Sequence, residues 1–279
     1  MIPRPLRRAG RWLLDSLTWD PWAGRHWSQE GEDLVLLRLF GQRSDGFYVD
    51  VGAHHPRRFS NTHALYRRGW QGINIDARPG SKALFDRARP RDINLEVGVA
   101  RTAGTLEYYA FSEPALNGFD KHLAEARPES FPGVRLLHTQ KVPVKPLAAI
   151  LEEHASGRSI DFLNVDVEGL DLEVLQSNDW TRFRPGLVLV EMLGSSLQDL
   201  QEEPVGRFLL GRYEVNLVRT QNTAHGGEIL SQQGEDEMIS SLSQLRPPGF
   251  SLSKPFERYE RDHIRVSRVF FSVRAKVRL

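Results

Sequence analysis

Carboxylate side chains stand at or near the ends of several short apolar or β-branched segments, and a carboxylate can bind hydroxyls, accept a proton or hold a metal ion. Segments of this kind, separated by stretches long enough for a helix, predict consecutive strands of a parallel α/β sheet. Ligands of such sheets bind just beyond the carboxyl ends of the strands, so we expect these acids beside a ligand. The segments are 47–53, 72–76, 94–99 and 161–169, and their acids include Asp50, Asp76, Asp166 and Glu168.

The first segment narrows the choice of ligand, because it contains a single glycine, Gly52. A dinucleotide fold needs the three glycines of G-x-G-x-x-G, and a P-loop needs a Lys followed by Ser or Thr. A cofactor with a ribose but no phosphate needs this glycine-rich loop less, and S-adenosylmethionine is the common one. Asp76 ends the next segment, where an acid that accepts hydrogen bonds from ribose hydroxyls belongs. In the alternative interpretation, Asp50 and Asp76 only cap the helices that follow.

Several longer stretches occur in a characteristic order: 50–56, 59–62 with 68–72, 76–80 and 166–175, preceded by 28–33. Together they resemble the FkbM family of S-adenosylmethionine-dependent O-methyltransferases, and the likeness covers about residues 28–224. The resemblance implies a class I, Rossmann-like α/β fold with a mostly parallel sheet flanked by helices. It also implies methyl transfer to a hydroxyl, often on a sugar or a polyketide.

The resemblance and the strand ends together predict the site residues. Methyl transfer needs an acceptor oxygen held in line with the methyl group and a group that takes its proton. For that role we expect Asp166 and Glu168, with His55 from the first loop. Related sugar methyltransferases place magnesium ligands at the positions of Asp166 and Glu191, although two carboxylates are fewer than a hard cation usually takes. The expected cofactor-binding residues are Gln29, Asp50, Gly52, Asn61, Asp76, Ala77, Val97, Gly98 and Asp166.

Two further segments, 105–111 and 136–144, predict strands where a plain doubly wound unit has only a helix. We therefore expect an antiparallel β insertion at the edge of the sheet. The turn-rich loop 113–119 between them predicts a lid or a substrate wall, or else an ordinary surface loop. Beyond a near-continuous apolar strand at 187–192, the alternating segment 213–220 predicts an antiparallel edge strand.

The chain divides into a basic, aromatic segment 1–27, a methyltransferase domain 28–224 and a C-terminal extension 225–279 of unknown role. Residues 1–27 lack the continuous apolar core of a signal peptide. They could rest on an anionic membrane surface, fold over the cofactor cleft or pack on a second subunit of a homo-oligomer. The sequence has no cysteine, which excludes disulfides and thiolate metal sites and is compatible with the cytoplasm.

The expected function is S-adenosylmethionine-dependent O-methylation of a hydroxyl, in a sugar, a glycan or another small-molecule acceptor. One alternative is a catalytically degenerate module of the same fold that binds the cofactor or a partner without turnover. A nicotinamide-dependent sugar enzyme is a second alternative, which the missing glycines disfavour. The formal net charge of +1 gives no preference for nucleic acid, so we expect no such partner.

Overall fold

The computed structural model describes residues 26–193, 202–215, 220–222 and 266–272. The predictions for residues 1–25, and those for most of 225–279, lie outside the described residues. Within the described ranges, no helix is long and apolar enough to cross a membrane. Trp27, the last residue of the predicted N-terminal segment, lies against His63 with 5.0 Å between the ring centroids. Its carbonyl oxygen also accepts a hydrogen bond from the Ser60 amide.

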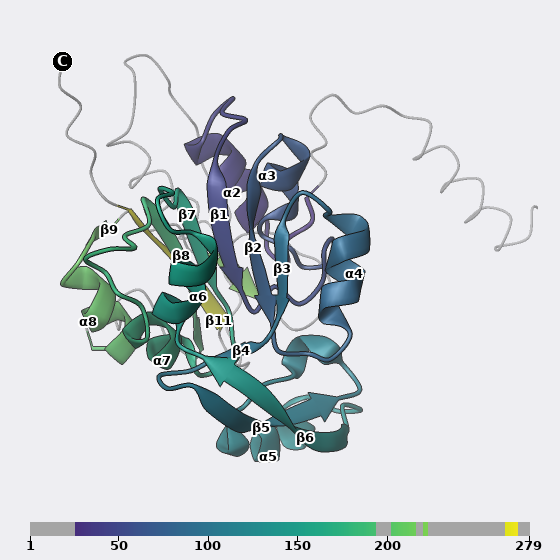
Figure 1. Cartoon of the computed structure of the whole chain (residues 1–279). Helices are drawn as coiled ribbons and strands as arrows, with labels where there is room; N and C mark the ends of the chain where they lie inside the picture. Colours follow the sequence, from purple (N-terminus) through teal and green to yellow (C-terminus); the bar gives the residue numbers. More distant parts are fainter. Residues whose placement is uncertain (1–25, 194–201, 216–219, 223–265, 273–279) are drawn as a thin grey trace, which may run out of the picture.

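A twisted sheet of eight described strands forms the centre of the fold, in the order β10-β11-β8-β7-β1-β2-β3, with β9 paired to β11 beside β10 (Figure 1). Its five parallel strands are β1 (Phe47–Val51), β2 (Gln71–Asp76), β3 (Ile93–Glu96), β7 (Phe162–Val165) and β8 (Leu187–Leu193). Three antiparallel strands complete it: β9 (Glu214–Val215), β10 (Thr220–Asn222) and β11 (Val266–Ser272). The sheet is thus mostly parallel with an antiparallel edge, as the sequence predicts.

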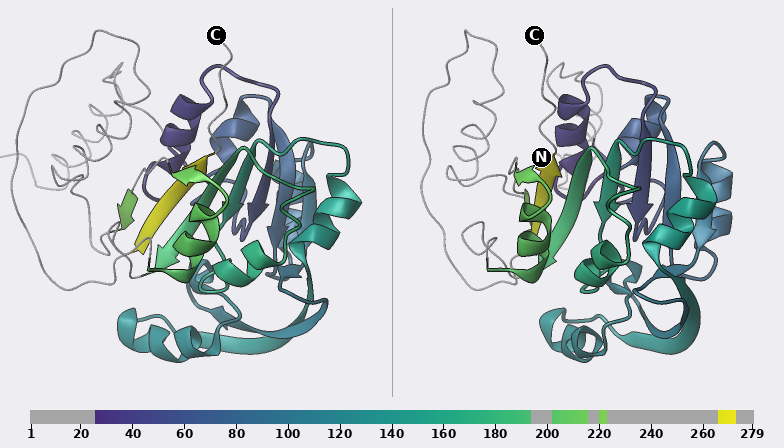
Figure 2. Two further views of the ribbon diagram at one scale, coloured as in Figure 1. Left: turned by 90° about the vertical axis from the view of Figure 1, so that its left-hand side faces the viewer. Right: turned by 60° about the vertical axis from the view of Figure 1, so that its left-hand side comes forward.

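Helices cover both faces of this sheet (Figure 2). The central strands are rich in Val, Ile and Leu because their side chains are buried on both faces. Val49 and Val51 of β1 share a core cluster with residues of α6 (Leu147–His154), α7 (Asp171–Gln176) and α8 (Pro204–Leu210). Tyr48, which points to the opposite face, packs with α2 (Glu32–Leu39) and α3 (His63–Arg67). A further helix, α4 (Ser81–Ala88), contacts β2 and β3.

The predicted β insertion is present and forms a sheet of its own. Within it, β5 (Gly104–Phe111) pairs antiparallel with β6 (Leu136–Lys145), and β6 pairs parallel with β4 (Gly98–Val99). Between β5 and β6 lie the short helix η1 (Pro114–Leu116) and α5 (Lys121–Ser130). The insertion lies below the main sheet in Figure 1, at the carboxyl ends of β1, β2 and β3. It is therefore placed to form one wall of a site at those strand ends.

One strand of the predicted C-terminal extension belongs to the main sheet. Residues 266–272 form β11, which pairs with β8 along its whole length and with β9 and β10 on its other side. The predicted edge strand at 213–220 corresponds in its described part to β9, and to the first residue of β10. The strand next to β8 is therefore supplied by a segment far along the chain, to which the sequence gives no role.

Candidate active site

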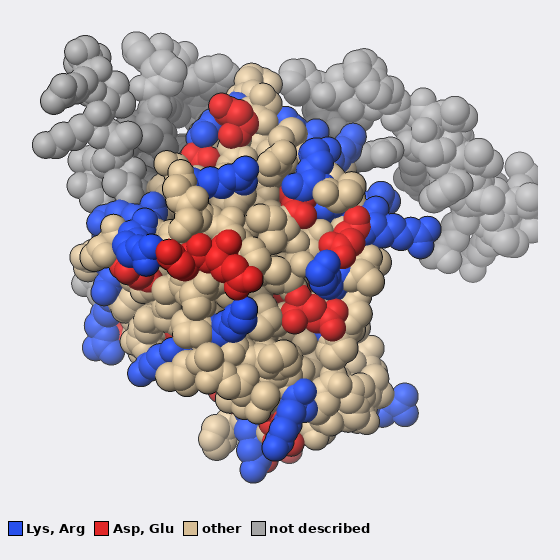
Figure 3. Space-filling model, in the orientation of Figure 1, with Lys and Arg blue, Asp and Glu red and all other residues tan. Residues whose placement is uncertain are grey.

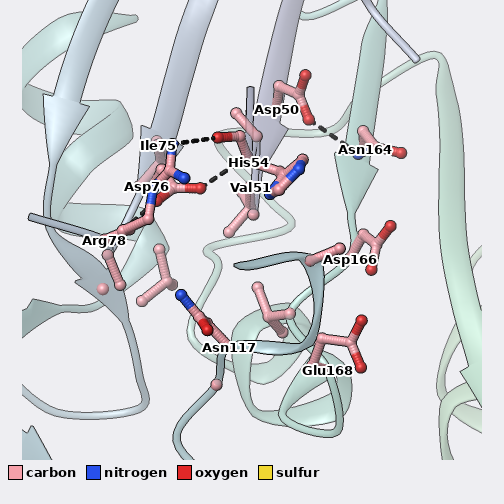
Figure 4. Close-up of a pocket in the computed structure, with 18 of the residues that line it drawn as sticks. Asp50, Val51, His54, Ile75, Asp76, Arg78, Asn117, Asn164, Asp166 and Glu168 are labelled. Carbon is pink, nitrogen blue, oxygen red and sulfur yellow. Dashed lines mark hydrogen bonds between the residues drawn. The ribbon is translucent and has the colours of Figure 1, made fainter. Parts of the chain in front are cut away.

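An open cavity lies between the carboxyl ends of β1, β2 and β7 and the insertion (Figure 4). It measures about 930 Å³, a volume that includes the part open to solvent. Every predicted cofactor residue lines it: Gln29, Asp50, Gly52, Asn61, Asp76, Ala77, Val97, Gly98 and Asp166. Of the other predicted residues, Glu168 lines the cavity, whereas His55 and Glu191 are not among the lining residues.

Gly52 follows β1 at a point where two strand ends nearly touch. Its φ angle of 81° is in the left-handed region, where glycine is favoured. A Cβ atom here would overlap the carbonyl oxygen of Asp166 at the end of β7. The Gly52 and Ala53 amides both donate to the carbonyl of Ile75, at 2.9 and 3.1 Å. The glycine therefore allows the backbones after β1 and β7 to meet beneath the cavity.

Asp76, the last residue of β2, holds two loops with its carboxylate. Oδ2 accepts a hydrogen bond from the His54 amide at 2.6 Å, and Oδ1 accepts one from the Arg78 amide at 2.8 Å. Burial raises the pKa of Asp76 to about 6, and the hydrogen bond from the Arg78 amide opposes the rise. Since each carboxylate oxygen has two lone pairs, both can still accept a bond from a ligand hydroxyl. The helix-capping alternative does not describe these contacts, because α4 begins only at Ser81.

Asp50 is part of a buried polar row that crosses the sheet. Its Oδ1 accepts from Asn164 Nδ2 at 2.8 Å and its Oδ2 accepts from the Thr62 hydroxyl at 2.6 Å. The same row continues from Asn74 to Asn94, whose side chains are joined at 2.8 Å. Burial raises the pKa of Asp50, while the Thr62 hydrogen bond and the charge of Arg89 lower it. Asp50 thus fixes the end of the first loop as well as lining the cavity.

Arg89 supplies positive charge beneath this row, from a fully buried side chain. Its guanidinium donates to the Thr62 hydroxyl at 2.8 Å, the Ser60 hydroxyl at 2.6 Å and the Pro56 carbonyl at 2.7 Å. All three acceptors belong to the loop that follows β1. The arginine therefore holds the first loop in place from below.

Asn61 presents a buried acceptor at the cavity. Its Nδ2 donates to Asn164 Oδ1 at 3.0 Å, while its Oδ1 has no hydrogen-bond partner among the described residues. An unsatisfied buried amide oxygen costs free energy unless a ligand or water supplies a donor. Asn61 is thus a ready acceptor for a donor group on a bound ligand.

The two histidines of the first loop have different positions. His54 lines the cavity, and burial, followed by the charges of Arg78 and Arg58, lowers its pKa to about 4. Its ring is therefore neutral at neutral pH. His55 Nδ1 accepts hydrogen bonds from the amides of Arg57 and Arg58 at 3.0 and 2.9 Å, which stabilise a turn outside the cavity lining. Of the two, only His54 lines the cavity, although the sequence led us to expect His55 as the catalytic histidine.

Three carboxylates come together at the end of β7 and β8. One carboxylate oxygen from each of Asp166, Glu168 and Glu191 lies within 4.8 Å of the other two. Glu168 also accepts a hydrogen bond from Arg127 of α5 at 2.8 Å. Behind them, Asp171 accepts from the Val167 and Gly169 amides, and burial together with the charge of Asp166 raises its pKa to about 7. The family resemblance implies Asp166 and Glu191 as a pair of metal ligands, and in the structure Glu168 lies beside them.

The insertion contributes wall residues that the sequence does not assign individually. Tyr108 of β5 and five residues of the predicted loop 113–119 line the cavity, namely Pro114, Ala115, Asn117, Gly118 and Phe119. The turn-rich composition of this loop was a signal for the wall, but it does not identify which side chains face inward. Arg78 and Asn164 also line the cavity, and both lie inside segments that the sequence does single out.

The Methyltransferase FkbM domain matches the chain over residues 50–265. The chain therefore belongs to the FkbM methyltransferase family, its fold is the class I, Rossmann-like fold of methyltransferases, and it is a methyltransferase. No curated protein sequence matches it.

Among solved structures, the chain is similar to the C-terminal domain of precorrin-6Y C5,15-methyltransferase from Rhodobacter capsulatus, with 11% identity and a TM-score of 0.40. The match covers 92% of this chain and 95% of that one. An O-methyltransferase from Bacillus cereus in complex with SAH is similar at 9% identity and a TM-score of 0.37, over 96% of this chain and 88% of that one.

Proposed function

We propose that the protein transfers a methyl group from S-adenosylmethionine to a hydroxyl group, and that the acceptor is a sugar or a glycan. The observation that carries the proposal is the arrangement of acids around one cavity. Asp76 lies on one side, and Asp166 and Glu168 lie on the opposite side (Figure 4). A ribose-binding acid and a pair of proton acceptors fit these two positions.

The residues present fit the cofactor. S-adenosylmethionine supplies a methyl group activated on a sulfonium ion. Asp76 has acceptor capacity left on both oxygens for ribose hydroxyls, as described above. The buried Oδ1 of Asn61 suits a charged amino group, because a charge-assisted hydrogen bond is stronger than a neutral one. The close backbone turn at Gly52 leaves the cavity floor free of side chains there.

Asp166 and Glu168 can supply the base that a hydroxyl acceptor requires. An alcohol is a poor nucleophile until its proton is removed. In the proposed reaction, a bond forms between the acceptor oxygen and the methyl carbon, the carbon–sulfur bond breaks, and the proton passes to a carboxylate. Several carboxylates and the side-chain amide of Asn117 also line the cavity. Such groups can form hydrogen bonds with an acceptor that carries more than one hydroxyl.

The test begins with isothermal titration of S-adenosylmethionine into the full chain, followed by labelled methyl transfer to a panel of sugars and alkyl glycosides. Asp166→Asn and Glu168→Gln should keep cofactor affinity within a few fold. We expect the variant that lacks the base to lose about 10²- to 10⁴-fold in turnover. A folded protein that does not bind the cofactor contradicts the proposal. Binding without transfer to any acceptor would support the degenerate module.

A magnesium ion is the second candidate for the cluster of Asp166, Glu168 and Glu191, since Mg²⁺ prefers oxygen ligands. The guanidinium of Arg127 beside Glu168 already supplies positive charge there, and so we favour proton acceptors over metal ligands. Activity that survives exhaustive chelation, with no gain when magnesium is added back, would support this choice. Loss of activity that only a divalent cation restores would assign the cluster to a metal.

The proposal includes no nucleic-acid partner. On the face shown in Figure 3, basic and acidic side chains are interspersed, and the formal net charge is +1. Nucleic-acid binding relies on a concentrated basic surface.

We keep a cytoplasmic location in the proposal as well. Membrane or subunit contacts through residues 1–27 stay predictions, and residues 1–25 of that segment lie outside the described part of the chain.

A further inference from the structure

An ion pair joins the insertion to the loop that carries the proposed base. Arg127 of α5 donates from Nη2 to Glu168 Oε2 at 2.8 Å. The side chains are 7% and 19% exposed, so the pair is largely removed from solvent. Arg127 also lies over the ring of Phe111, 5.5 Å from its centroid, which anchors the guanidinium to β5. The two partners come from different parts of the fold and meet only in the folded protein.

The backbone around Glu168 is held in an unusual form. Glu168 has a φ angle of 57°, in the left-handed region that non-glycine residues rarely adopt. The next residue, Gly169, has a φ angle of 107°, and a Cβ there would lie 2.5 Å from Leu123 of α5. Below the loop, Asp171 accepts from the Gly169 amide. The loop is thus packed between α5 and the start of α7, and its strained residue carries the carboxylate.

A second ion pair also joins the insertion to the rest of the domain. Comparing the two pairs can distinguish a specific effect of Arg127 on Glu168 from a general effect of attaching the insertion. Arg58 of the first loop pairs with Glu113 at the start of η1, with nitrogen–oxygen distances of 3.0 and 3.1 Å. These side chains are 47% and 37% exposed, so the pair contributes little to stability. Its two residues belong to the first loop and to the start of η1, not to α5 or to the loop that carries Glu168. Both pairs attach the insertion, but only that of Arg127 acts on a proposed base.

We propose that Arg127 is a positioning residue that acts through Glu168. It holds the Glu168 carboxylate at the cavity wall, where the carboxylate meets the acceptor hydroxyl. Arg127 is not among the cavity-lining residues, so it does not touch the acceptor itself. A buried ion pair is weak evidence for stability, whereas its geometry can fix one arrangement of a site. This inference rests on the proposed function of Glu168.

The central experiment compares Arg127→Met, Glu168→Gln and the double variant in labelled methyl transfer to the panel of alkyl glycosides. Arg127→Met should lower kcat about 10²-fold, the effect of displacing a reacting group by about 1 Å, and leave cofactor affinity within about threefold. In the Glu168→Gln background the same change should cause little further loss, because the two residues act as one unit. Arg127→Lys keeps the charge and should retain more activity than Arg127→Met.

Two other basic residues provide matched controls. Lys121→Met removes a basic residue from the same helix, where Lys121 pairs with Glu125 at the surface, and should leave kcat unchanged. Arg58→Met removes the other ion pair of the insertion and should reduce kcat far less than Arg127→Met. Equal losses in Arg58→Met and Arg127→Met, both persisting in the Glu168→Gln background, would mean that attachment of the insertion matters and would overturn the inference.

A measurement without acceptor completes the test. Hydrogen exchange at the Val167 and Gly169 amides, which donate to Asp171, should be faster in Arg127→Met than in Lys121→Met. Unchanged exchange would overturn the inference, and Arg127→Lys replaces Arg127→Met if the latter does not fold. Absence of transfer by the wild type contradicts the proposed function itself. A slow Glu168→Gln with a fully active Arg127→Met contradicts only the role of Arg127.

Discussion

At the scale of single residues, Asp76 shows how the fold alters a group that the sequence identifies. Its position at a strand end predicts a ribose ligand, and the same position buries it until it is only 9% exposed. Two backbone amides hold the carboxylate in a fixed orientation, so little ordering is needed when a ligand binds. The same burial raises its pKa into a range that experiments can reach.

Asp76→Ala should weaken S-adenosylmethionine binding tenfold or more. Charge-assisted hydrogen bonds contribute about 1.5 to 3 kcal/mol each, and about 1.4 kcal/mol corresponds to a factor of ten in affinity. Isothermal titration measures the change, with circular dichroism to confirm the fold. Asp45→Ala is the matched control, since the Asp45 side chain is 82% exposed and pairs with Arg43. Unchanged affinity in a folded Asp76→Ala would remove the ribose assignment.

Cofactor affinity should also depend on pH through Asp76. The folded pKa is about 6, above the ordinary value of 3.8, so the carboxyl group is protonated below about pH 6. Ribose hydroxyls donate to the ionised form, and affinity should therefore rise between pH 5 and pH 7 and then level off. Titrations across this range test the effect. Asp76→Asn should bind more weakly without this pH dependence, and a wild type with flat affinity over the range would contradict it.

At the scale of elements, the loops after β1 and β7 form one structural unit. The sequence assigns Gly52, the single glycine of the first segment, to the cofactor site. The structure gives a reason for the glycine, since the first atom that a side chain meets is the backbone oxygen of Asp166. The Asp166 amide in turn donates to the Val51 carbonyl at 3.0 Å. A change at Gly52 therefore moves a proposed catalytic residue as well as the cofactor loop.

Gly52→Ala should lose both cofactor binding and stability. A left-handed backbone alone costs a non-glycine residue about 1 to 2 kcal/mol, and the overlap with Asp166 adds to that cost. Gly157→Ala is the matched control, because Gly157 has a φ angle of 77° with no atom within 4 Å of the added Cβ. Urea unfolding should show a larger loss for Gly52→Ala, and titration a loss of binding in that variant alone. Equal losses of stability would disprove the backbone collision.

The elements that the sequence predicts best are those that depend on the pattern of neighbouring residues. The parallel strands show as β-branched runs, and β5 and β6 show as paired runs around a turn-rich loop. The contacts that the sequence does not reveal join distant segments in a particular register. Asp50 meets Asn164 only because β1 and β7 pair at that position, and Arg127 meets Glu168 only after the insertion folds back. Residue types alone did not specify either partner.

At the scale of the whole molecule, the order of the strands across the sheet differs from their order along the chain. β11 lies between β8 and the pair β9 and β10, although β9 and β10 precede it in sequence. The sequence does not indicate its partner, since the connection from β10 spans residues 223–265. The family match likewise ends at residue 265, one residue before β11 begins. The domain boundary that the sequence predicts near residue 224 therefore lies between β10 and β11, which are neighbours in the sheet.

Truncation after residue 265 should destroy cooperative folding and cofactor binding together. It removes the only described partner of β9 and β10 and leaves β8 as an unpaired edge of the parallel sheet. Circular dichroism during heating and isothermal titration with S-adenosylmethionine measure the two losses.

Ser267→Pro gives a milder test in the full chain, because proline has no backbone N–H to donate to a neighbouring strand. Ser267 is paired on both sides, with Met192 of β8 and Gln221 of β10. The substitution should lower the midpoint of thermal unfolding by about 5 °C or more, which corresponds to a few kcal/mol for a domain of this size. A chain truncated after residue 265 that unfolds cooperatively at the wild-type temperature and binds the cofactor would show that β11 is dispensable. The methyltransferase domain would then end before β11, and the function of that strand would have to lie elsewhere.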